Sequence, residues 1–477
     1  MTDAIAPARR GSYPLRKGNA VRPLIDGMPA FRRIAAAVAA ARASIWATVA
    51  FVERDLLLPG AGGTLFDLLD GAVARGLDVR ILFWREPELE RLLPGASHFG
   101  GTEADRLWLM ARDGRFLARW DHLPRYCHHQ KTWLVDAGQP GEVAFVGGIN
   151  LDHGSMVLPG HAPVGGGGDD LYANVHDLYL ELRGPAATDV HHNFVQRWNE
   201  ASERDRPDGG WPDCERAARL PFPAVVSPAA GRVPAQVART VRAGCYRDAT
   251  PAPDAPSFPI DAGEQSVLEQ YLAAIDGAVH SVYLENQFLH SLDVLPRLEA
   301  ALARGVVVTF VAPGVPMRDI RAARADPRAA PFFAQLEALG RHPNFTLAGL
   351  AASCGGGRYE DVYVHAKAAL VDDRWVTIGS TNVAGRSFHA DTELNVSFWD
   401  AGAARALRVT LLREHLDVDT DSLDDRAALA VFQEVARANR DRRRRGEPLQ
   451  GLAVALDPAR YGAYQGIAAA ERGRMIA

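Results

Sequence analysis

Helix-like stretches alternate with short apolar runs along most of the chain. Residues 34–46, IAAAVAAARASIW, have the alanine content and apolar spacing of a helix, and a β-like run follows at 45–51. Residues 74–84 and 303–313 each read as a helix end, a glycine at the C-cap and a short apolar strand. This alternation predicts an α/β fold in which helices cover both faces of a sheet.

The same pattern occurs twice. Residues 271–283, YLAAIDGAVHSVY, repeat the alanine and serine positions of residues 34–46 at a spacing of 237, and the pair 74–84 and 303–313 repeats at a spacing of 229. Both spacings are close to half of the 477-residue chain. We therefore expect two copies of one α/β unit.

The domain boundaries follow from this repeat. We expect an N-terminal lobe over 20–200, a connecting segment over 201–262 that is rich in Pro, Arg and Asp, a C-terminal lobe over 263–420, and a helical extension over 421–477. The glycine run 165–168 predicts a flexible loop, either a surface insertion, which is favoured, or a substrate lid.

Composition narrows the class of protein. The net charge of −5 argues against a nucleic-acid binder that works by bulk phosphate neutralisation. The sequence has no 18-residue uncharged apolar run and no apolar segment typical of a signal peptide, so we expect a cytoplasmic protein without a spanning helix. Its four cysteines are scattered and predict reduced thiols without a zinc site. The oligomeric state is left open, and a monomer is plausible.

The candidate chemistry is a His-x-Lys-x₄-Asp motif that occurs once in each copy, 236 residues apart. The motif residues are His129, Lys131 and Asp136 in the first copy and His365, Lys367 and Asp372 in the second. Because side chains alternate along a strand, the histidine and lysine of each motif share one face and the aspartate has the opposite parity. Although we group the two aspartates with the catalytic motifs, we expect them to be orienting or turn-forming groups more than direct acids.

Chance does not account for this pair of motifs. With 15 His and three Lys in the chain, roughly 0.1 His-x-Lys triplets are expected at random. Of the 53 basic residues only three are lysines, Lys17, Lys131 and Lys367, and two of them lie in the motifs. A compact ammonium suits contact with a phosphoryl oxygen where a planar guanidinium does not.

A glycine-containing segment follows each motif and suggests an anion site. The first copy has Gly-Gly-Ile-Asn at 147–150 and the second has Gly-Ser-Thr-Asn at 379–382. Glycines allow close backbone approach, and amide or hydroxyl groups can donate to an anionic oxygen. The predicted phosphate-binding residues are Gly148, Asn150, Gly379, Ser380 and Asn382.

Two histidines with two lysines suit the cleavage of a phosphodiester. The lysines neutralise its non-bridging oxygens, one neutral imidazole attacks phosphorus, and the other imidazole, protonated, donates to the leaving alcohol. Water or another alcohol then accepts the phosphoryl group. This chemistry requires no metal and no cofactor. Since imidazole titrates near 6.5, a bell-shaped dependence of rate on pH is expected.

A nucleophilic histidine needs an acceptor on its second ring nitrogen. In the second copy Glu393 follows the Asn382 segment within a strand-like run, and in the first copy Asp177 has the comparable setting. We predict that Asp177 orients His129 and that Glu393 orients His365.

These motifs resemble those of the phospholipase D superfamily. HHQKTWLVD with GGINLDHG resembles the first motif of phosphatidylcholine-type enzymes. YLENQFL at 283–289, the segment 363–396 and LLREHLD at 411–417 resemble later blocks of the same branch, and the resemblance extends over about 20–420. It implies two similar α/β/α sandwich lobes with mixed sheets, related by a pseudo-two-fold axis, with one active site at the lobe interface.

The resemblance also implies a mechanism and a substrate. It implies metal-independent covalent catalysis with His129 as nucleophile and His365 as general acid/base, and a phosphatidic acid product. Gly148 departs from the Ser380 of the second copy, and His128 adjoins His129 outside the His-x-Lys register. We expect no calcium dependence, because the motif-bearing unit begins near residue 20.

The expected function is therefore a phospholipase D that acts on glycerophospholipids at a membrane surface, with water or alcohol as acceptor and without nucleic acid as a partner. A cardiolipin synthase-type phosphatidyltransferase is the first alternative, disfavoured by the absence of N-terminal membrane helices. A superfamily nuclease is disfavoured by the net charge and by the longer two-copy chain, and tyrosyl-DNA phosphodiesterases typically lack the motif aspartates that are present here. A non-catalytic lipid-binding scaffold is expected to have lost a motif His or Lys.

Two segments are candidates for membrane contact. The basic run of Arg437, Arg440 and 442–445 is either a surface for anionic lipid or, as favoured, a solvated helix end. Apolar groups at Trp84, 92–93 and 108–110 either line an acyl entrance or, as favoured, belong to the core.

Overall fold

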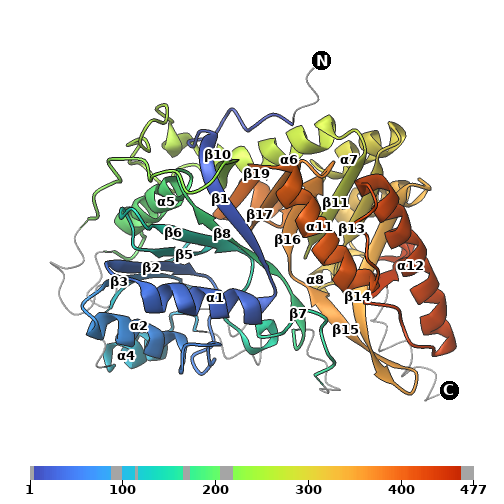
Figure 1. Cartoon of the computed structure of the whole chain (residues 1–477), viewed down its shortest axis with the longest axis horizontal. Helices are drawn as coiled ribbons and strands as arrows, with labels where there is room; N and C mark the ends of the chain where they lie inside the picture. Colours follow the sequence, from blue (N-terminus) through green and yellow to red (C-terminus); the bar gives the residue numbers. More distant parts are fainter. Residues whose placement is uncertain (1–4, 87–98, 113–115, 165–171, 205–218, 464–477) are drawn as a thin grey trace.

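The computed structural model describes residues 5–86, 99–112, 116–164, 172–204 and 219–463 and shows two α/β halves side by side (Figure 1). The elements of the first half are β1 (Arg16–Ile25), α1 (Gly27–Ala40), β2 (Ser44–Val49), α2 (Leu65–Ala74), β3 (Asp78–Trp84), α4 (Glu103–Met110), β4 (Leu117–Asp121), β5 (Lys131–Val135), β6 (Val143–Gly147), β7 (Val175–His176), β8 (Leu178–Arg183) and α5 (Ala187–Glu200).

The second half repeats this succession and then extends it. Its elements are β9 (Val233–Val241), β10 (Glu264–Gln265), α6 (Ser266–Gly277), β11 (Ser281–Asn286), β12 (Leu289–His290), α7 (Leu295–Ala303), β13 (Val307–Val311), α8 (Arg318–Ala323), α9 (Ala330–Gly340), β14 (Phe345–Gly355), β15 (Arg358–Val364), β16 (Lys367–Val371), β17 (Trp375–Gly379), β18 (Val383–Ala384), α10 (Gly385–His389), β19 (Glu393–Trp399), α11 (Ala401–Leu416), α12 (Asp425–Arg445) and β20 (Ala453–Ala455).

The two sheets have the same strand order. The first runs β1-β8-β6-β5-β2-β3-β4 and the second β9-β19-β17-β16-β11-β13-β14, and in each the first four pairings are antiparallel and the last two parallel. The equivalent strands β1 and β9 pair antiparallel with each other, which relates the halves by an approximate two-fold axis. The predicted α/β fold with mixed sheets and covering helices is confirmed.

The repeat spacings have a direct structural counterpart. Helix α1 ends at Ala40 and β2 begins at Ser44, just as α6 ends at Gly277 and β11 begins at Ser281. Between α2 and β3, and between α7 and β13, the chain turns through Gly76 and Gly305, whose φ angles are 84° and 88°. Both glycines occupy the left-handed conformation expected at a helix C-cap.

The segments outside the predicted lobes add strands to the sheets. The predicted connecting segment 201–262 is more than a linker, because it contains β9, which pairs with both β1 and β19. The predicted helical extension 421–477 contains α12, and it also contains β20, which pairs antiparallel with β14. The predicted glycine loop at 165–168 lies outside the described residues.

One hydrophobic core spans both halves. It includes Trp46 and Phe194 of the first half and Val396 and Leu411 of the second, all buried. The rings of Trp46 and Phe194 stack at 5.1 Å between centroids. Since full burial of such a side chain contributes about 1.5–3 kcal/mol, this shared core holds the two sheets, and the motifs they carry, in a fixed relation.

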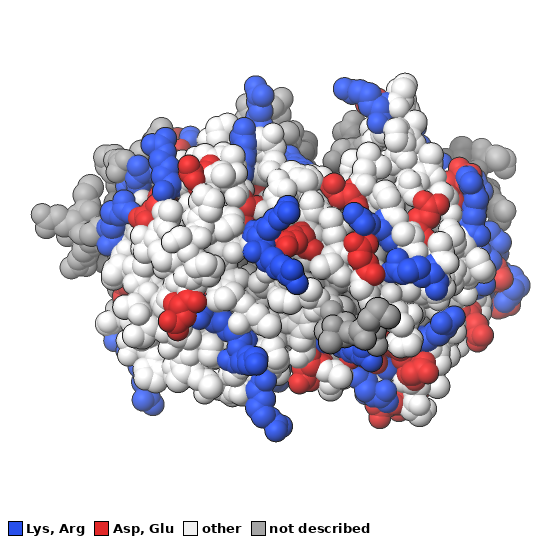
Figure 2. Space-filling model, turned by 90° about the horizontal axis from the view of Figure 1, so that it is seen from above, with Lys and Arg blue, Asp and Glu red and all other residues white. Residues whose placement is uncertain are grey.

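The surface mixes charges of both signs. Figure 2 shows acidic and basic side chains interspersed on the face seen from above. At the end of α12, Arg443 pairs with Asp361 at 3.2 Å and Arg445 pairs with Glu447 at 2.8 Å. These acidic partners favour the interpretation of the basic run as a solvated helix end. Among the helices of the described ranges, none has the length and apolar character needed to cross a bilayer.

Candidate active site

The two motif histidines lie where the halves meet, and each is oriented by a carboxylate from the opposite half. His129 Nδ1 lies 3.0 and 3.1 Å from the two Glu393 carboxylate oxygens and donates to the main-chain oxygen of Ser380 at 2.9 Å. His365 Nδ1 lies 2.5 Å from Asp177 Oδ2. The predicted pairing of Asp177 with His129 and of Glu393 with His365 is therefore wrong.

The exchange of carboxylates has a backbone cause. The amide of His129 donates to the carbonyl of Thr392 at 2.9 Å, and the amide of His365 donates to the carbonyl of His176 at 2.9 Å. Each motif histidine is thus pinned beside the residue that immediately precedes the orienting carboxylate of the other half. A prediction that treats each copy as self-contained cannot find this arrangement.

The acceptors around each Nδ1 define the tautomer of the imidazoles. The Ser380 carbonyl can only accept a hydrogen bond, so His129 carries a proton on Nδ1. When such an imidazole is neutral, its Nε2 bears the lone pair. The same logic applies to His365 when Asp177 is ionised. Both rings then have an Nε2 able to attack or to accept a proton.

Both motif lysines are buried and held by the backbone of their own motifs. Lys131 Nζ donates to the carbonyl of His129 at 2.8 Å and lies 5.7 Å from the centre of the Phe51 ring. Lys367 Nζ donates to the carbonyl of His365 and to Gln287 Oε1, the latter at 3.2 Å. Gln287 and Phe51 were missed as site residues, although Gln287 lies within the quoted YLENQFL block.

Burial shifts the pKa values of the two motif histidines, the two motif lysines and the two orienting carboxylates. Burial, together with the charges of Lys131 and Lys367, lowers the pKa of His129 and of His365 well below its ordinary value. Burial lowers the pKa of Lys131, and it lowers the pKa of Lys367 to about 7.

The two orienting carboxylates shift in the opposite direction. Burial raises the pKa of Asp177 and of Glu393 to about 7 in each case, even though the motif lysines act against this shift. The charge of His129 also contributes to the lowered pKa of His365, as expected for two imidazoles in one site. Such perturbed groups are typical of catalytic centres.

The motif aspartates hold the far ends of their strands. Asp136 accepts hydrogen bonds from the amides of residues 42–44, and Asp372 accepts hydrogen bonds from the amides of residues 279–281. The φ angles of Asp136 and Asp372 are 56° and 54°. These contacts tie each aspartate to the loop before a neighbouring strand, and they place both carboxylates at the end of the strand opposite the lysine.

The segments predicted to bind phosphate have mixed roles. The Ser380 hydroxyl donates to Glu393 Oε2 at 2.5 Å, so its predicted use for phosphate is corrected to one of holding that carboxylate. A Cβ on Gly148 would overlap Asp177 and come within 2.9 Å of Lys367 Cδ, and a Cβ on Gly379 would overlap Asn395. The amide of Gly148 already donates to the Leu178 carbonyl. Both glycines therefore make room for side chains.

The two asparagines remain candidates for contact with substrate. Asn150 Oδ1 and Asn382 Oδ1 are buried and have no hydrogen-bond partner within the described ranges. They occupy equivalent positions after β6 and β17. Since buried polar atoms normally have partners, these amides suit a polar ligand.

The aromatic candidates separate into two environments. Trp84 is buried beside Phe51, with ring centroids 5.2 Å apart, and Phe51 in turn lies 6.4 Å from the His129 ring. Trp108 packs against Phe66 at 4.8 Å in the core of the first half. Residues 92–93 lie outside the described part of the chain. His128 is buried and pairs with Asp121 at 3.1 Å, which agrees with its exclusion from the motif.

Comparison with known families agrees with these motifs. Residues 271–414 match the family described as "Cardiolipin synthase, PLD-like domain". Phospholipase D beta 2 from Arabidopsis thaliana is 24% identical over 522 residues, with 82% of this chain and 56% of that protein covered. Cardiolipin synthase A from Pseudomonas aeruginosa is also 24% identical, over 438 residues, with 90% of this chain and 74% of that protein covered.

Phospholipase D alpha 1 from Zea mays is 24% identical, with 82% of this chain and 63% of that protein covered. The chain thus spans less than two thirds of the plant relatives it matches. Among solved structures, phosphatidylserine synthase from Haemophilus influenzae Rd KW20 is similar with a TM-score of 0.54 and 13% identity, over 97% of this chain and 95% of that one. This similarity concerns the fold.

Proposed function

The chain belongs to the phospholipase D superfamily, and from this premise we propose that it cleaves the distal phosphodiester of glycerophospholipids through a phosphohistidine intermediate. Members of the superfamily are phosphodiesterases or phosphatidyltransferases. The observation that supports the proposal is the pair of imidazoles at the junction of the halves, each held at Nδ1, with Lys131 and Lys367 beside them.

In the first step, Nε2 of His129 attacks phosphorus and the bond between phosphorus and the head-group oxygen breaks. Protonated His365 donates its Nε2 proton to that oxygen, so the head group leaves as an alcohol and not as an alkoxide. Lys131 and Lys367 stabilise the charge on the non-bridging oxygens. The bound phosphodiester anion offsets the lysine charges and thereby favours protonation of one imidazole.

In the second step, His365 Nε2 takes a proton from water and the water oxygen attacks phosphorus. The phosphorus–nitrogen bond breaks, which releases phosphatidic acid and restores both histidines. Another alcohol in place of water would give transphosphatidylation. In both steps Glu393 accepts the Nδ1 proton of His129 as a hydrogen bond, and this fixes the orientation of the attacking ring.

The lipid substrate is proposed from the relatives. Phospholipase D and cardiolipin synthase A are names of proteins that act in phospholipid metabolism, and the net charge of −5 with interspersed surface charge offers little attraction for nucleic acid. Contact with lipid is expected to be peripheral.

A phosphatidyltransferase of the cardiolipin synthase type is the second candidate. It is favoured by the family description matched by residues 271–414 and by the 90% coverage of this chain by cardiolipin synthase A. The two activities differ only in the acceptor that reaches the phosphohistidine, so an assay of products separates them.

Vesicles of phosphatidylcholine and, separately, of phosphatidylglycerol test the proposal. We expect choline and phosphatidic acid from the first, and loss of both products in His129→Ala and His365→Ala. Cardiolipin and glycerol from phosphatidylglycerol, with little choline release, would favour the transferase instead. Wild-type turnover in both histidine variants would refute the mechanism.

A substrate with a p-nitrophenol leaving group tests which histidine is the nucleophile. The nitrophenolate leaves without being protonated, so His365→Ala should still release about one equivalent per chain and retain the phosphatidyl group covalently. The matched variant His129→Ala should give no burst. The reverse result would assign the nucleophile to His365.

A further inference from the structure

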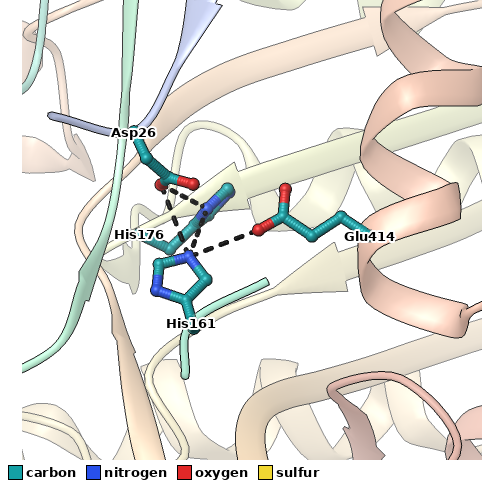
Figure 3. Close-up of side chains that lie close together, drawn as sticks. All are labelled: Asp26, His161, His176 and Glu414. Atoms are coloured by element: carbon teal, nitrogen blue, oxygen red, sulfur yellow. Dashed lines mark hydrogen bonds and ion pairs between the residues drawn. The ribbon is translucent and has the colours of Figure 1, made fainter. Parts of the chain in front are cut away.

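A second group of histidines and carboxylates adjoins the catalytic pairs but shares no side chain with them. Its four members come from distant segments, and the nearest ligand atoms lie within 4.8 Å of one another (Figure 3). Asp26 follows β1, His161 lies in the loop before β7, His176 is on β7, and Glu414 is on α11 of the second half. The first three are almost completely buried and the Glu414 side chain is 7% exposed.

The distances from His161 Nε2 to the other three ligand atoms are close to the edges of a coordination tetrahedron, and the distance from His176 Nδ1 to Asp26 Oδ1 is shorter, at 2.9 Å. His161 Nε2 lies 3.3 Å from His176 Nδ1, 3.4 Å from Asp26 Oδ1 and 3.5 Å from Glu414 Oε1. Four ligands at about 2.0–2.1 Å from a tetrahedral metal ion are separated from one another by about 3.3 Å. These three distances are longer than good hydrogen bonds, whereas the contact between His176 Nδ1 and Asp26 Oδ1 has the length of an ordinary hydrogen bond. His161 Nε2 is therefore the ligand atom whose surroundings hydrogen bonding explains least well.

The outer ring nitrogens have the partners that metal-bound histidines need. His161 Nδ1 donates to Asn174 Oδ1 at 2.7 Å, which leaves the Nε2 lone pair directed into the cluster. His176 Nε2 lies 3.0 Å from Glu285 Oε2, a carboxylate that also bonds His415 at 2.8 Å. A carboxylate or carbonyl on the second nitrogen is typical of zinc-bound histidine.

Asp26 provides an independent indication of a ligand. Its Oδ2 atom is buried and lacks a hydrogen-bond partner within the described residues, although the carboxylate points into the cluster (Figure 3). Its φ and ψ angles are 63° and 161°, a backbone conformation that is unfavourable for every residue except glycine. Strain of this kind usually persists where function requires it.

We propose that Asp26, His161, His176 and Glu414 bind one divalent transition-metal ion of the zinc class. Two imidazole nitrogens and two carboxylate oxygens in tetrahedral spacing suit Zn²⁺. The ion links the first half to α11 of the second. It also braces the strand beside the active site, because the His176 carbonyl accepts the amide of His365 and the next residue is Asp177.

Zinc binding to the full chain tests this site. Protein stripped with a chelator is incubated with zinc chloride, separated from free ion, and its zinc content is measured by mass spectrometry. About one zinc per chain is expected in the wild type, and much less in His161→Ala and Glu414→Gln. The control is His153→Ala, which removes a histidine whose side chain is 61% exposed and should leave the zinc content unchanged.

Cobalt provides a readout of geometry. Co²⁺ in the wild type should show the visible absorption of a four-coordinate ion, and both cluster variants should lack it. Circular dichroism checks folding. If His161→Ala does not fold, Glu414→Gln carries the test, since glutamine retains the shape and the acceptor for the Gly160 amide. Equal zinc in the wild type and Glu414→Gln, or its loss in His153→Ala, would overturn the proposal.

Discussion

At the scale of the residue, arginine cannot replace lysine at the two motif positions, 131 and 367, without changing the contacts. Lys131 and Lys367 each fold back so that Nζ reaches the carbonyl of the histidine two positions earlier. Both are buried, and the flat guanidinium of arginine is larger and directs its donors differently. The abundance of arginine elsewhere in the sequence makes the two buried lysines stand out as selected for their size.

Replacing either buried lysine by arginine should therefore reduce turnover although the charge is kept. We expect a loss of about 10²–10³-fold in kcat for Lys131→Arg and for Lys367→Arg, comparable with the removal of one group that stabilises a developing charge. Lys17→Arg is the control, because Lys17 is the third lysine and is exposed. Near-wild-type kcat in a motif variant would contradict the proposed contact.

The carboxylate of Glu393 also has a measurable effect on stability. Burial raises its pKa from 4.5 to about 7, so between these pH values the folded chain retains a proton that the unfolded chain has lost. Raising the pH through this window therefore reduces stability, by up to about 3 kcal/mol. Glu393→Gln removes this effect, and its advantage in unfolding free energy over the wild type should grow from pH 5 to pH 7 and then level off.

Urea unfolding at pH 5, 6, 7 and 8 measures this difference. Glu181→Gln is a control of opposite sign, since the hydrogen bonds and charge of Arg33 outweigh burial and lower the pKa of Glu181. That variant should lose stability at neutral pH and approach the wild type as the pH falls. A Glu393→Gln advantage that shrinks as the pH rises from 5 to 7 would refute the assignment.

At the scale of the element, the motif aspartates join strand ends to the loops that follow helices. Asp136 closes β5 onto the start of β2, and Asp372 closes β16 onto the start of β11 in the same way. The spacing between lysine and aspartate that the two motifs share is thus the length of one five-residue strand. The end of each strand that carries the lysine lies at the candidate active site, and the end that carries the aspartate is hydrogen-bonded to the start of the neighbouring strand.

Asp136→Ala should destabilise the fold without changing the chemistry. Loss of an acceptor shared by backbone amides, with a left-handed φ at a non-glycine residue, is expected to cost about 3 kcal/mol. We expect a lower Tm and an unchanged kcat per folded molecule. The exposed Asp55 offers a control in Asp55→Ala, which should change neither quantity. A large fall in kcat with an unchanged Tm would show that Asp136 acts in catalysis.

At the scale of the whole molecule, the candidate site exists only when both halves are present. His129 depends on Glu393 of the second half, and His365 depends on Asp177 of the first. The close approach at Gly148 is part of the same junction, because its neighbours are Asp177 from its own half and Lys367 from the other. The approximate two-fold axis therefore builds one composite centre from two incomplete ones.

Adding one methyl group at this junction should disturb the centre. In Gly148→Ala the new Cβ would overlap Asp177 and press on Lys367, so we expect a fall in kcat of about 10²-fold or more, since misplacement by about 1 Å can have that effect. Gly141→Ala is the matched control, because a Cβ there meets nothing within 4 Å. Equal kcat in the two variants would contradict the close packing.

The sequence by itself determined the repeat, the alternation of helices and strands, the two motifs and the special place of lysine. These features are local or periodic, and local preference and side-chain alternation are sufficient to predict them. Only the tertiary structure decided that the carboxylates are exchanged between halves, that the Ser380 hydroxyl holds Glu393, and that Asp26 lies beside Glu414. The exchanged carboxylates and the approach of Asp26 to Glu414 join segments far apart in the chain, and packing of the two sheets around a shared core, which no local pattern encodes, brings them together. Ser380 and Glu393 are only 13 residues apart, and the pairing of β17 with β19 places them side by side.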